Sequence, residues 1–183
     1  MEIPTSKIKE LREQAGAGIM ECRNALVKAE GDIEKALVIL KQQSLITAGR
    51  RSRRSATQGL IETYIHTGGR IGAMVELSCE TDFVARTDEF KELARNLAMQ
   101  VVAQDPLYIS EEQVPEDAYM EPQMACLLLQ PYIKNPEQTI QEIISGTVAK
   151  TGENIKVSRF VRFELGQLNS RVAELETNIT VSE

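Results

Sequence analysis

The chain alternates apolar and other residues most regularly over nine positions, Ile71-Gly72-Ala73-Met74-Val75-Glu76-Leu77-Ser78-Cys79. Successive side chains of a strand point to opposite faces, so the odd-numbered residues form a mainly apolar face and the even-numbered ones a mixed face. Residues 60–66 form a second extended run, and the polar, Gly-rich residues 67–70 between the two runs suit a β-hairpin. The sequence therefore predicts a half-buried antiparallel sheet.

Helical patterns follow this hairpin. Thr81 is expected to cap a short helical turn over residues 82–86, and Asp88 to begin a longer helix. One face of the longer helix is apolar and carries Phe90, Leu93, Ala94, Leu97, Ala98 and Val101. The later residues predict a loop with a short helix (104–126), a short strand (127–129), a helix (139–150) and a last strand (155–165). Residues 59–166 are therefore expected to form an α+β core with a small antiparallel sheet packed on helices.

Three short helices with tight turns are predicted before the hairpin. Thr5 or Ser6 can cap the first helix, which stops at Gly16-Ala17-Gly18. The second runs from about residue 19 to residue 30, and the third follows the capping residue Asp32 and ends near residue 43. We expect a compact three-helix domain over residues 1–47, a basic linker over 48–58 and, after the core, a tail over 167–183. The pattern of the tail leaves a helix and a frayed chain both open.

Charge divides the chain in a similar way. Its 183 residues include 21 Lys or Arg and 27 Asp or Glu, and this net charge of −6 argues against a protein whose main task is to neutralise phosphates. Residues 1–58 carry a net charge of +4 and residues 59–183 one of −10. Aromatic residues make up 4% of the chain and are too scattered for a base-stacking platform. The basic linker nevertheless leaves one alternative function, a small nucleic-acid-binding adaptor that uses Arg50, Arg51, Arg53 and Arg54.

The sequence contains no clear catalytic or metal-binding constellation. Cys22, Cys79 and Cys126 are widely spaced and fit small buried apolar residues better than a disulfide framework or a zinc site. There is no phosphate-binding G-x-x-x-x-G-K-[ST] motif, and the single histidine, His66, has no Cys or Ser nucleophile beside it in the sequence. The acidic residues between 76 and 82 suit the start of a helix better than a pair of acid-base catalysts. An enzyme is therefore a poor fit, and no cofactor or metal is expected.

Membrane and export segments are not predicted either. Met1-Glu2-Ile3-Pro4 leads into polar residues, and the chain has no run of about 18 apolar residues. We therefore expect a soluble, cytoplasmic protein without a membrane partner.

Three ordered segments carry a family resemblance. The first is Leu11-Arg12-Glu13-Gln14-Ala15-Gly16-Ala17-Gly18-Ile19-Met20-Glu21-Cys22-Arg23-Asn24-Ala25-Leu26, followed by Gly31-Asp32-Ile33-Glu34-Lys35-Ala36. The second is Glu76-Leu77-Ser78-Cys79-Glu80-Thr81-Asp82-Phe83-Val84-Ala85-Arg86. The third joins Gln130-Pro131-Tyr132-Ile133-Lys134, Ala149-Lys150-Thr151-Gly152-Glu153-Asn154-Ile155 and Arg159-Phe160-Val161-Arg162-Phe163. Together, from Ile8 to Gly166, they resemble the elongation factor Ts family, the guanine-nucleotide exchange factors of the translational GTPase elongation factor Tu.

The resemblance implies a fold, a partner and a set of contact residues. The fold is a ubiquitin-associated-like three-helix domain joined to an α+β core, in agreement with the division reached above. In the family, the aromatic residue at the position of Phe83 enters a pocket of the GTPase, and the acid at the position of Asp82 perturbs the site of the nucleotide's Mg²⁺. Thr81 and Val84 flank these two residues. The expected outcome is the release of GDP from elongation factor Tu, so that GTP can bind.

Further contacts follow from the same resemblance. Arg12, Ile19 and Met20 match the family's contact with a helix of the GTPase, and His66 matches a histidine on a second hairpin that approaches it. Short family members can pair two copies to complete the exchange surface, so the resemblance leaves a homodimer open. Relatives carry a longer Lys- and Glu-rich insertion between Tyr119 and Leu127, and any contact made by that insertion is in doubt here.

Other interpretations of these residues remain open. Without the family context, a phenylalanine at a helix start is more often a core residue than a ligand, and Ile19 and Met20 would be assigned to packing. The position of Phe83 favours exposure, because the next helix already supplies its own apolar face. The three-helix domain alone would also fit a binder of ubiquitin-like proteins, although that function leaves residues 81–84 unexplained.

Overall fold

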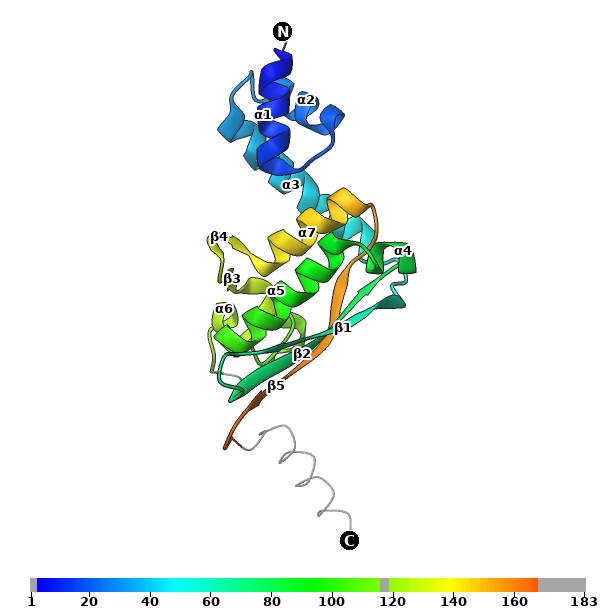
Figure 1. The fold of residues 1–183 in the computed structure, drawn as a ribbon. Helices are drawn as coiled ribbons and strands as arrows, with labels where there is room; N and C mark the ends of the chain where they lie inside the picture. The colour runs from blue at the N-terminus through cyan, green and yellow to red at the C-terminus, as the bar shows by residue number, and fades with distance from the viewer. Residues whose placement is uncertain (1–2, 116–118, 168–183) are drawn as a thin grey trace.

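A computed structural model describes residues 3–115 and 119–167 of the chain (Figure 1). Helices and a small antiparallel sheet are combined, which confirms the predicted α+β class. The elements are α1 (Thr5–Ala15), α2 (Ile19–Lys28), α3 (Ile33–Arg51), β1 (Gln58–Ile65), β2 (Ile71–Cys79), α4 (Asp82–Ala85), α5 (Asp88–Gln104), η1 (Glu111–Gln113), α6 (Pro122–Ala125), η2 (Leu127–Leu129), β3 (Pro131–Tyr132), β4 (Asn135–Thr139), α7 (Ile140–Thr151) and β5 (Lys156–Glu164).

Helices α1 to α3 enclose their own small apolar core, which contains Leu11, Cys22, Leu26 and Leu40. Asp32 caps α3 as predicted, because its carboxylate accepts a hydrogen bond from the Lys35 backbone N–H at 3.0 Å. The cap predicted for α1 is wrong: the helix begins after Pro4, without a side-chain cap, so that Thr5 and Ser6 already lie inside its first turn. The ubiquitin-associated-like character of these helices stays a prediction.

Helix α3 extends well beyond the predicted end near residue 43, to Arg51. Figure 1 shows α3 leaving the N-terminal helices and passing beside α7. The last turns of α3 are held beside α7 by two contacts. Ala48 packs against the apolar core formed by the sheet, α5 and α7. The Arg51 guanidinium donates a hydrogen bond to the Val148 carbonyl at 2.8 Å. Residues 48–51 of the predicted linker are therefore helical, while the division of the chain into domains stays a prediction.

The sheet has the strand order β1-β2-β5, with both pairs antiparallel. Gln58 lies opposite Cys79 at one end of the β1–β2 hairpin, and Ile65 lies opposite Gly72 at the other end. One face of the sheet packs on α5, where Val75 and Leu77 join the fully buried Phe90. The opposite face exposes apolar side chains, so the prediction of a half-buried sheet is confirmed.

Two local predictions fail between α5 and α7. Residues 127–129 form the 3₁₀ helix η2 and not a strand, and the following small hairpin, β3–β4, was not predicted. A run of three leucines has no period that separates a strand from a helical turn.

Residues 168–183 of the predicted tail lie outside the described residues. Within residues 3–115 and 119–167, no helix has the length and apolar character that crossing a lipid bilayer requires.

Candidate functional site

Residues 81–84, called the tip here, form a short structured projection at the end of β2. Thr81 caps α4, because its hydroxyl accepts a hydrogen bond from the Val84 backbone N–H at 3.5 Å. Val84 packs against the core of the sheet region, whereas the Phe83 side chain is 79% exposed. Large apolar side chains of soluble proteins are usually buried, so an aromatic ring held in solvent on an ordered turn is a candidate binding residue.

The acidic residue of the tip is paired within the same helical turn. The Asp82 carboxylate and the Arg86 guanidinium form an ion pair at 2.7 Å, and the Arg86 side chain is largely exposed while that of Asp82 is about half exposed. Exposed pairs of this kind contribute at most about 1 kcal/mol. The Asp82 carboxylate is therefore available to a new partner at a small energetic cost.

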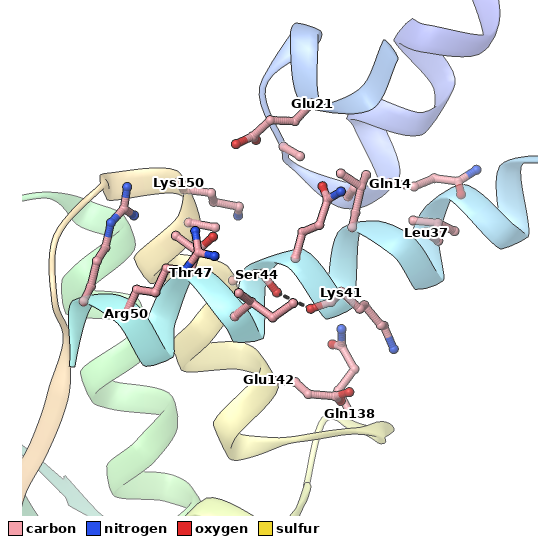
Figure 2. A pocket seen from close by; sticks show the side chains of 18 residues that line it. Gln14, Glu21, Leu37, Lys41, Ser44, Thr47, Arg50, Gln138, Glu142 and Lys150 are labelled. Atoms are coloured by element: carbon pink, nitrogen blue, oxygen red, sulfur yellow. Dashed lines mark hydrogen bonds between the residues drawn. The ribbon is translucent and has the colours of Figure 1, made fainter. Parts of the chain in front are cut away.

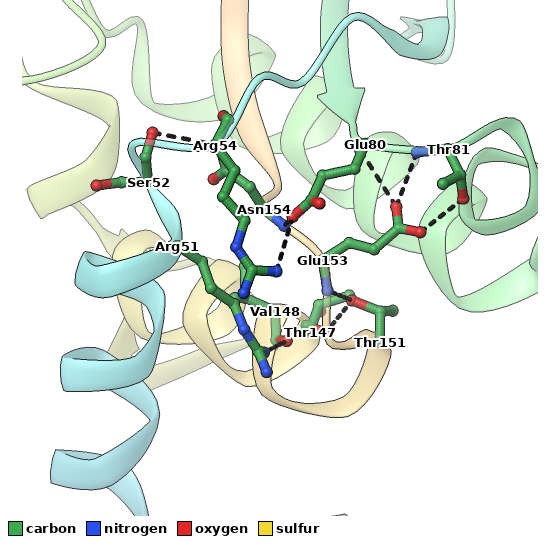
Figure 3. A network of polar contacts seen from close by, with 10 residues as sticks. All are labelled: Arg51, Ser52, Arg54, Glu80, Thr81, Thr147, Val148, Thr151, Glu153 and Asn154. Atoms are coloured by element: carbon green, nitrogen blue, oxygen red, sulfur yellow. Dashed lines mark hydrogen bonds and ion pairs between the residues drawn. The ribbon is translucent and has the colours of Figure 1, made fainter.

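The tip is anchored from beneath by polar groups of the loop that follows α7 (Figure 3). The Glu153 carboxylate accepts hydrogen bonds from the backbone N–H groups of Glu80 and Thr81, at 3.2 and 3.0 Å, and from the Thr81 hydroxyl at 2.6 Å. The Asn154 backbone N–H donates to the Glu80 carboxylate at 2.6 Å. These contacts were not predicted from the sequence.

A buried thiol adds one more contact to the tip. The Cys79 thiol donates a hydrogen bond to the Thr81 carbonyl, with a sulfur–oxygen distance of 3.1 Å. Burial, and then the nearby Glu153 carboxylate, raise the pKa of the Cys79 thiol, so it stays protonated and can donate at neutral pH. All three cysteines are free and buried, as the sequence predicts.

The predicted N-terminal contact residues lie around the turn between α1 and α2. Ile19 and Met20, the first residues of α2, are 57% and 61% exposed, and Arg12 is exposed on α1. The Glu21 carboxylate accepts a hydrogen bond from the Gly18 backbone N–H at 3.0 Å and so fixes the start of α2. The turn therefore presents two apolar side chains to solvent.

His66 begins the turn of the β1–β2 hairpin and is exposed. Its Nδ1 lies 3.2 Å from the Tyr64 hydroxyl. The register places this turn and the tip at opposite ends of the hairpin, and a nine-residue strand has a length of roughly 25 Å. The structure therefore does not bring His66 and the tip together, and any joint contact would need a large partner surface.

A groove lies between the α1–α2 turn, α3 and α7 (Figure 2). Its volume is about 450 Å³, and it is lined by side chains of both signs, including Glu21, Lys41, Arg50, Glu142 and Lys150. Among the residues that the structure describes, no group of three or more His, Cys, Asp or Glu side chains is placed to hold a metal ion. The exposed residues at the tip and at the α1–α2 turn are typical of a protein that binds another protein.

Comparisons with known proteins agree with this class. A sequence model of the family described as Elongation factor TS matches residues 28–124. The chain is 46% identical to the elongation factor Ts of Carboxydothermus hydrogenoformans over 195 residues, which cover 90% of each chain. It is 44% identical to that of Heliobacterium modesticaldum, covering 90% of this chain and 91% of the relative, and 43% identical to that of Thermotoga neapolitana, covering 91% and 99%.

The chain belongs to the elongation factor Ts family. Its role is that of a nucleotide exchange factor in translation elongation. The resemblance stated from the sequence is thereby confirmed.

Proposed function

We propose that the chain binds elongation factor Tu in its GDP form, in the cytoplasm, and disturbs the Mg²⁺ and phosphate site, so that GDP leaves and GTP can bind. The observation that carries the proposal is the exposed Phe83 ring on an ordered turn, next to the exposed Asp82 carboxylate. In this mechanism Phe83 enters an apolar pocket of the GTPase. Asp82 competes with the groups that hold the Mg²⁺, while Thr81 and Val84 hold the turn. No bond is made or broken.

The energetics require more than one contact. Displacing a tightly bound nucleotide means shifting an equilibrium from about 1:99 to 99:1, which needs roughly 5.5 kcal/mol of differential affinity. Burying one phenylalanine contributes about 1.5–3 kcal/mol. Arg12, Ile19 and Met20 supply a second contact on the same GTPase, and His66 a third. Linkage then requires that the factor binds the nucleotide-free GTPase better than the GDP form, and that incoming nucleotide weakens the factor's binding.

The test is the rate at which a fluorescent GDP analogue leaves elongation factor Tu in the presence of the factor. Phe83→Ala should slow this release about tenfold or more and leave the fold intact. Met124→Ala is a matched control, because Met124 is also exposed, at 70%, and takes part in none of the proposed contacts. Equal release rates for Phe83→Ala and the unaltered protein would remove the ring from the mechanism.

Asp82 gives a second, separable readout. If the carboxylate acts on the Mg²⁺ site, Asp82→Ala should reduce the rate of GDP release more than it reduces affinity for the GTPase. Equal losses in release and in affinity would show that Asp82 is only an anchor. Affinity is measured by titration of nucleotide-free GTPase, and release by stopped-flow fluorescence.

We propose further that a second copy of the chain covers the outer face of the sheet. This face carries exposed apolar side chains on all three strands, including Ile61, Ile65, Met74 and Phe163. An isologous dimer would bury the same patch on both copies. Phe163→Glu should then convert a dimer to a monomer in light-scattering measurements at micromolar concentration. A monomeric unaltered protein under those conditions would refute the dimer.

The nucleic-acid alternative receives less support from the geometry. Arg51 donates to the Val148 carbonyl, and Arg54 lies 3.5 Å from the Glu80 carboxylate, so two of the four arginines contact the protein itself. We therefore expect no direct nucleic-acid partner. Salt-dependent binding of RNA by the factor alone would favour the alternative.

A further inference from the structure

The hydrogen bonds of Glu153 define the orientation of the tip. Its Oε2 accepts from the backbone N–H groups of Glu80 and Thr81, and its Oε1 accepts from the Thr81 hydroxyl. A hydroxyl has one hydrogen, so a Thr81 side chain that donates to Glu153 turns its lone pairs toward other donors. One of these donors is the Val84 backbone N–H, which lies in the single turn of α4. Glu153 therefore fixes both the backbone before α4 and the side chain that caps it.

Asn154, the next residue, connects the tip to the segment that follows α3. Its backbone N–H donates to the Glu80 carboxylate at 2.6 Å, and its side-chain amide donates to the carbonyls of Ser52 and Arg54 at 3.3 and 2.7 Å (Figure 3). Asn154 is 4% exposed. Asn154 therefore fixes residues 52–54, which directly follow α3. Helices α1 and α2 pack against α3.

A third contact from the same region reaches the α1–α2 turn itself. Gly16 has a φ of +62° and lies directly against the side chain of Lys150, whose Nζ also forms an ion pair with Glu89 at 2.9 Å. Residues 150–154 therefore contact the α1–α2 turn, the end of α3 and the tip. Both proposed contact regions of the factor are supported by this one short segment.

We propose that Glu153 is a positioning residue for nucleotide exchange: it holds the tip, before the GTPase arrives, in the orientation in which Phe83 can enter its pocket. The inference rests on the proposed role of Phe83 and extends it. The exposed ring has little packing of its own, so its direction follows from the backbone of α4, which Glu153 and Thr81 determine. A preorganised contact avoids the ordering cost that a loose tip would have to meet on binding.

The principal variant is Glu153→Gln, which keeps the size of the side chain and replaces one acceptor oxygen by an amide that donates. Glu142→Gln is its matched control. Glu142 also accepts a hydrogen bond from a backbone N–H, that of Thr139 at 3.0 Å, but at the start of α7 and away from the tip. Thr81→Val, which removes the hydroxyl, is a second variant expected to behave like Glu153→Gln.

The first readout uses the free factor. Amide hydrogen exchange of Glu80 and Thr81 should become about tenfold faster in Glu153→Gln and stay unchanged in Glu142→Gln. The second readout is GDP release from elongation factor Tu, which should slow about tenfold in Glu153→Gln only. In a Phe83→Ala background, Glu153→Gln should have a much smaller effect on release than in the unaltered protein, because it acts mainly through the orientation of that ring.

The outcomes separate the two proposals. If Phe83→Ala leaves GDP release unchanged, the proposed function fails, and the amide exchange of Glu80 and Thr81 still decides whether Glu153 orders the tip. If Phe83→Ala slows release but Glu153→Gln matches Glu142→Gln in both readouts, the positioning role is overturned. Additive losses in the double variant would also overturn it, since they would show that Glu153 acts independently of the ring.

Discussion

Alanine substitutions at Phe83 and Phe90 should differ greatly in their cost to stability, although the two residues are only seven positions apart. Phe83 is 79% exposed, so about a fifth of its surface is buried. Full burial of a phenylalanine stabilises a fold by about 1.5–3 kcal/mol, so Phe83→Ala should cost only about 0.3–0.6 kcal/mol. Phe90 is 0% exposed, between α5 and the sheet. Its replacement leaves a cavity, and Phe90→Ala should cost about 3–5 kcal/mol.

Chemical denaturation distinguishes these values. Unfolding by guanidinium chloride, followed by circular dichroism, gives the free energy of unfolding of each variant. Protein concentration must be held constant, because association of two copies would add a concentration-dependent contribution. A loss of more than about 1.5 kcal/mol for Phe83→Ala would refute the reasoning, since the ring would then be packed inside its own protein and unavailable to a GTPase.

Three further predictions concern two glycines and the thiols. Gly146→Ala in α7 should stabilise the fold by about 0.5–1 kcal/mol, because the new methyl group meets no atom within 4 Å. By contrast, Gly59→Ala should destabilise it by at least about 1–3 kcal/mol, because Gly59 has a φ of +149° and the methyl group would strike the opposing strand; thermal unfolding measures both. Burial raises the pKa of all three thiols above the ordinary 9.0, because the folded protein favours the neutral thiol over the thiolate. The stability that this preference contributes is fully present below pH 9.0, and it is lost as the pH rises through the higher folded-state pKa. The native protein should therefore resist Ellman's reagent at pH 8 and react only when unfolded, and a fast-reacting native thiol would contradict this.

The parts of the fold that the sequence predicts well are those with a local period. The alternation over residues 71–79 and the apolar stripe of α5 each specify one element and its buried face, and both elements are found where they were predicted. The burial of the three cysteines follows from their character as small apolar residues without a disulfide or zinc-site spacing. The exposure of Phe83 was also expected, because α5 already has a complete apolar face without it.

The errors occur where tertiary contacts override local patterns. Residues 48–51 lack an apolar stripe, yet they remain helical because Arg51 and Ala48 contact the region around α7. The leucines 127–129 turn into a 3₁₀ helix before Gln130, whose buried amide donates to the carbonyls of Gln104 and Met124 at 3.3 and 2.8 Å. A buried glutamine that satisfies carbonyls 6 and 26 residues away leaves no periodic trace in the sequence.

The support of the tip was missed for a different reason, because its partners are 72 and 73 residues apart in the chain. The missing information is the pairing of β5 with β2. Once Lys156 is placed opposite Ser78 in an antiparallel pair, residues 153 and 154 must lie beside Thr81 and Glu80. Two polar residues that precede such a strand, separated from it by Ile155, are then the natural acceptors and donors for a turn that follows the neighbouring strand. The pairing of β2 with β5 and its register therefore determine which residues can orient Phe83, and a sequence interpretation that assigns both would find Glu153.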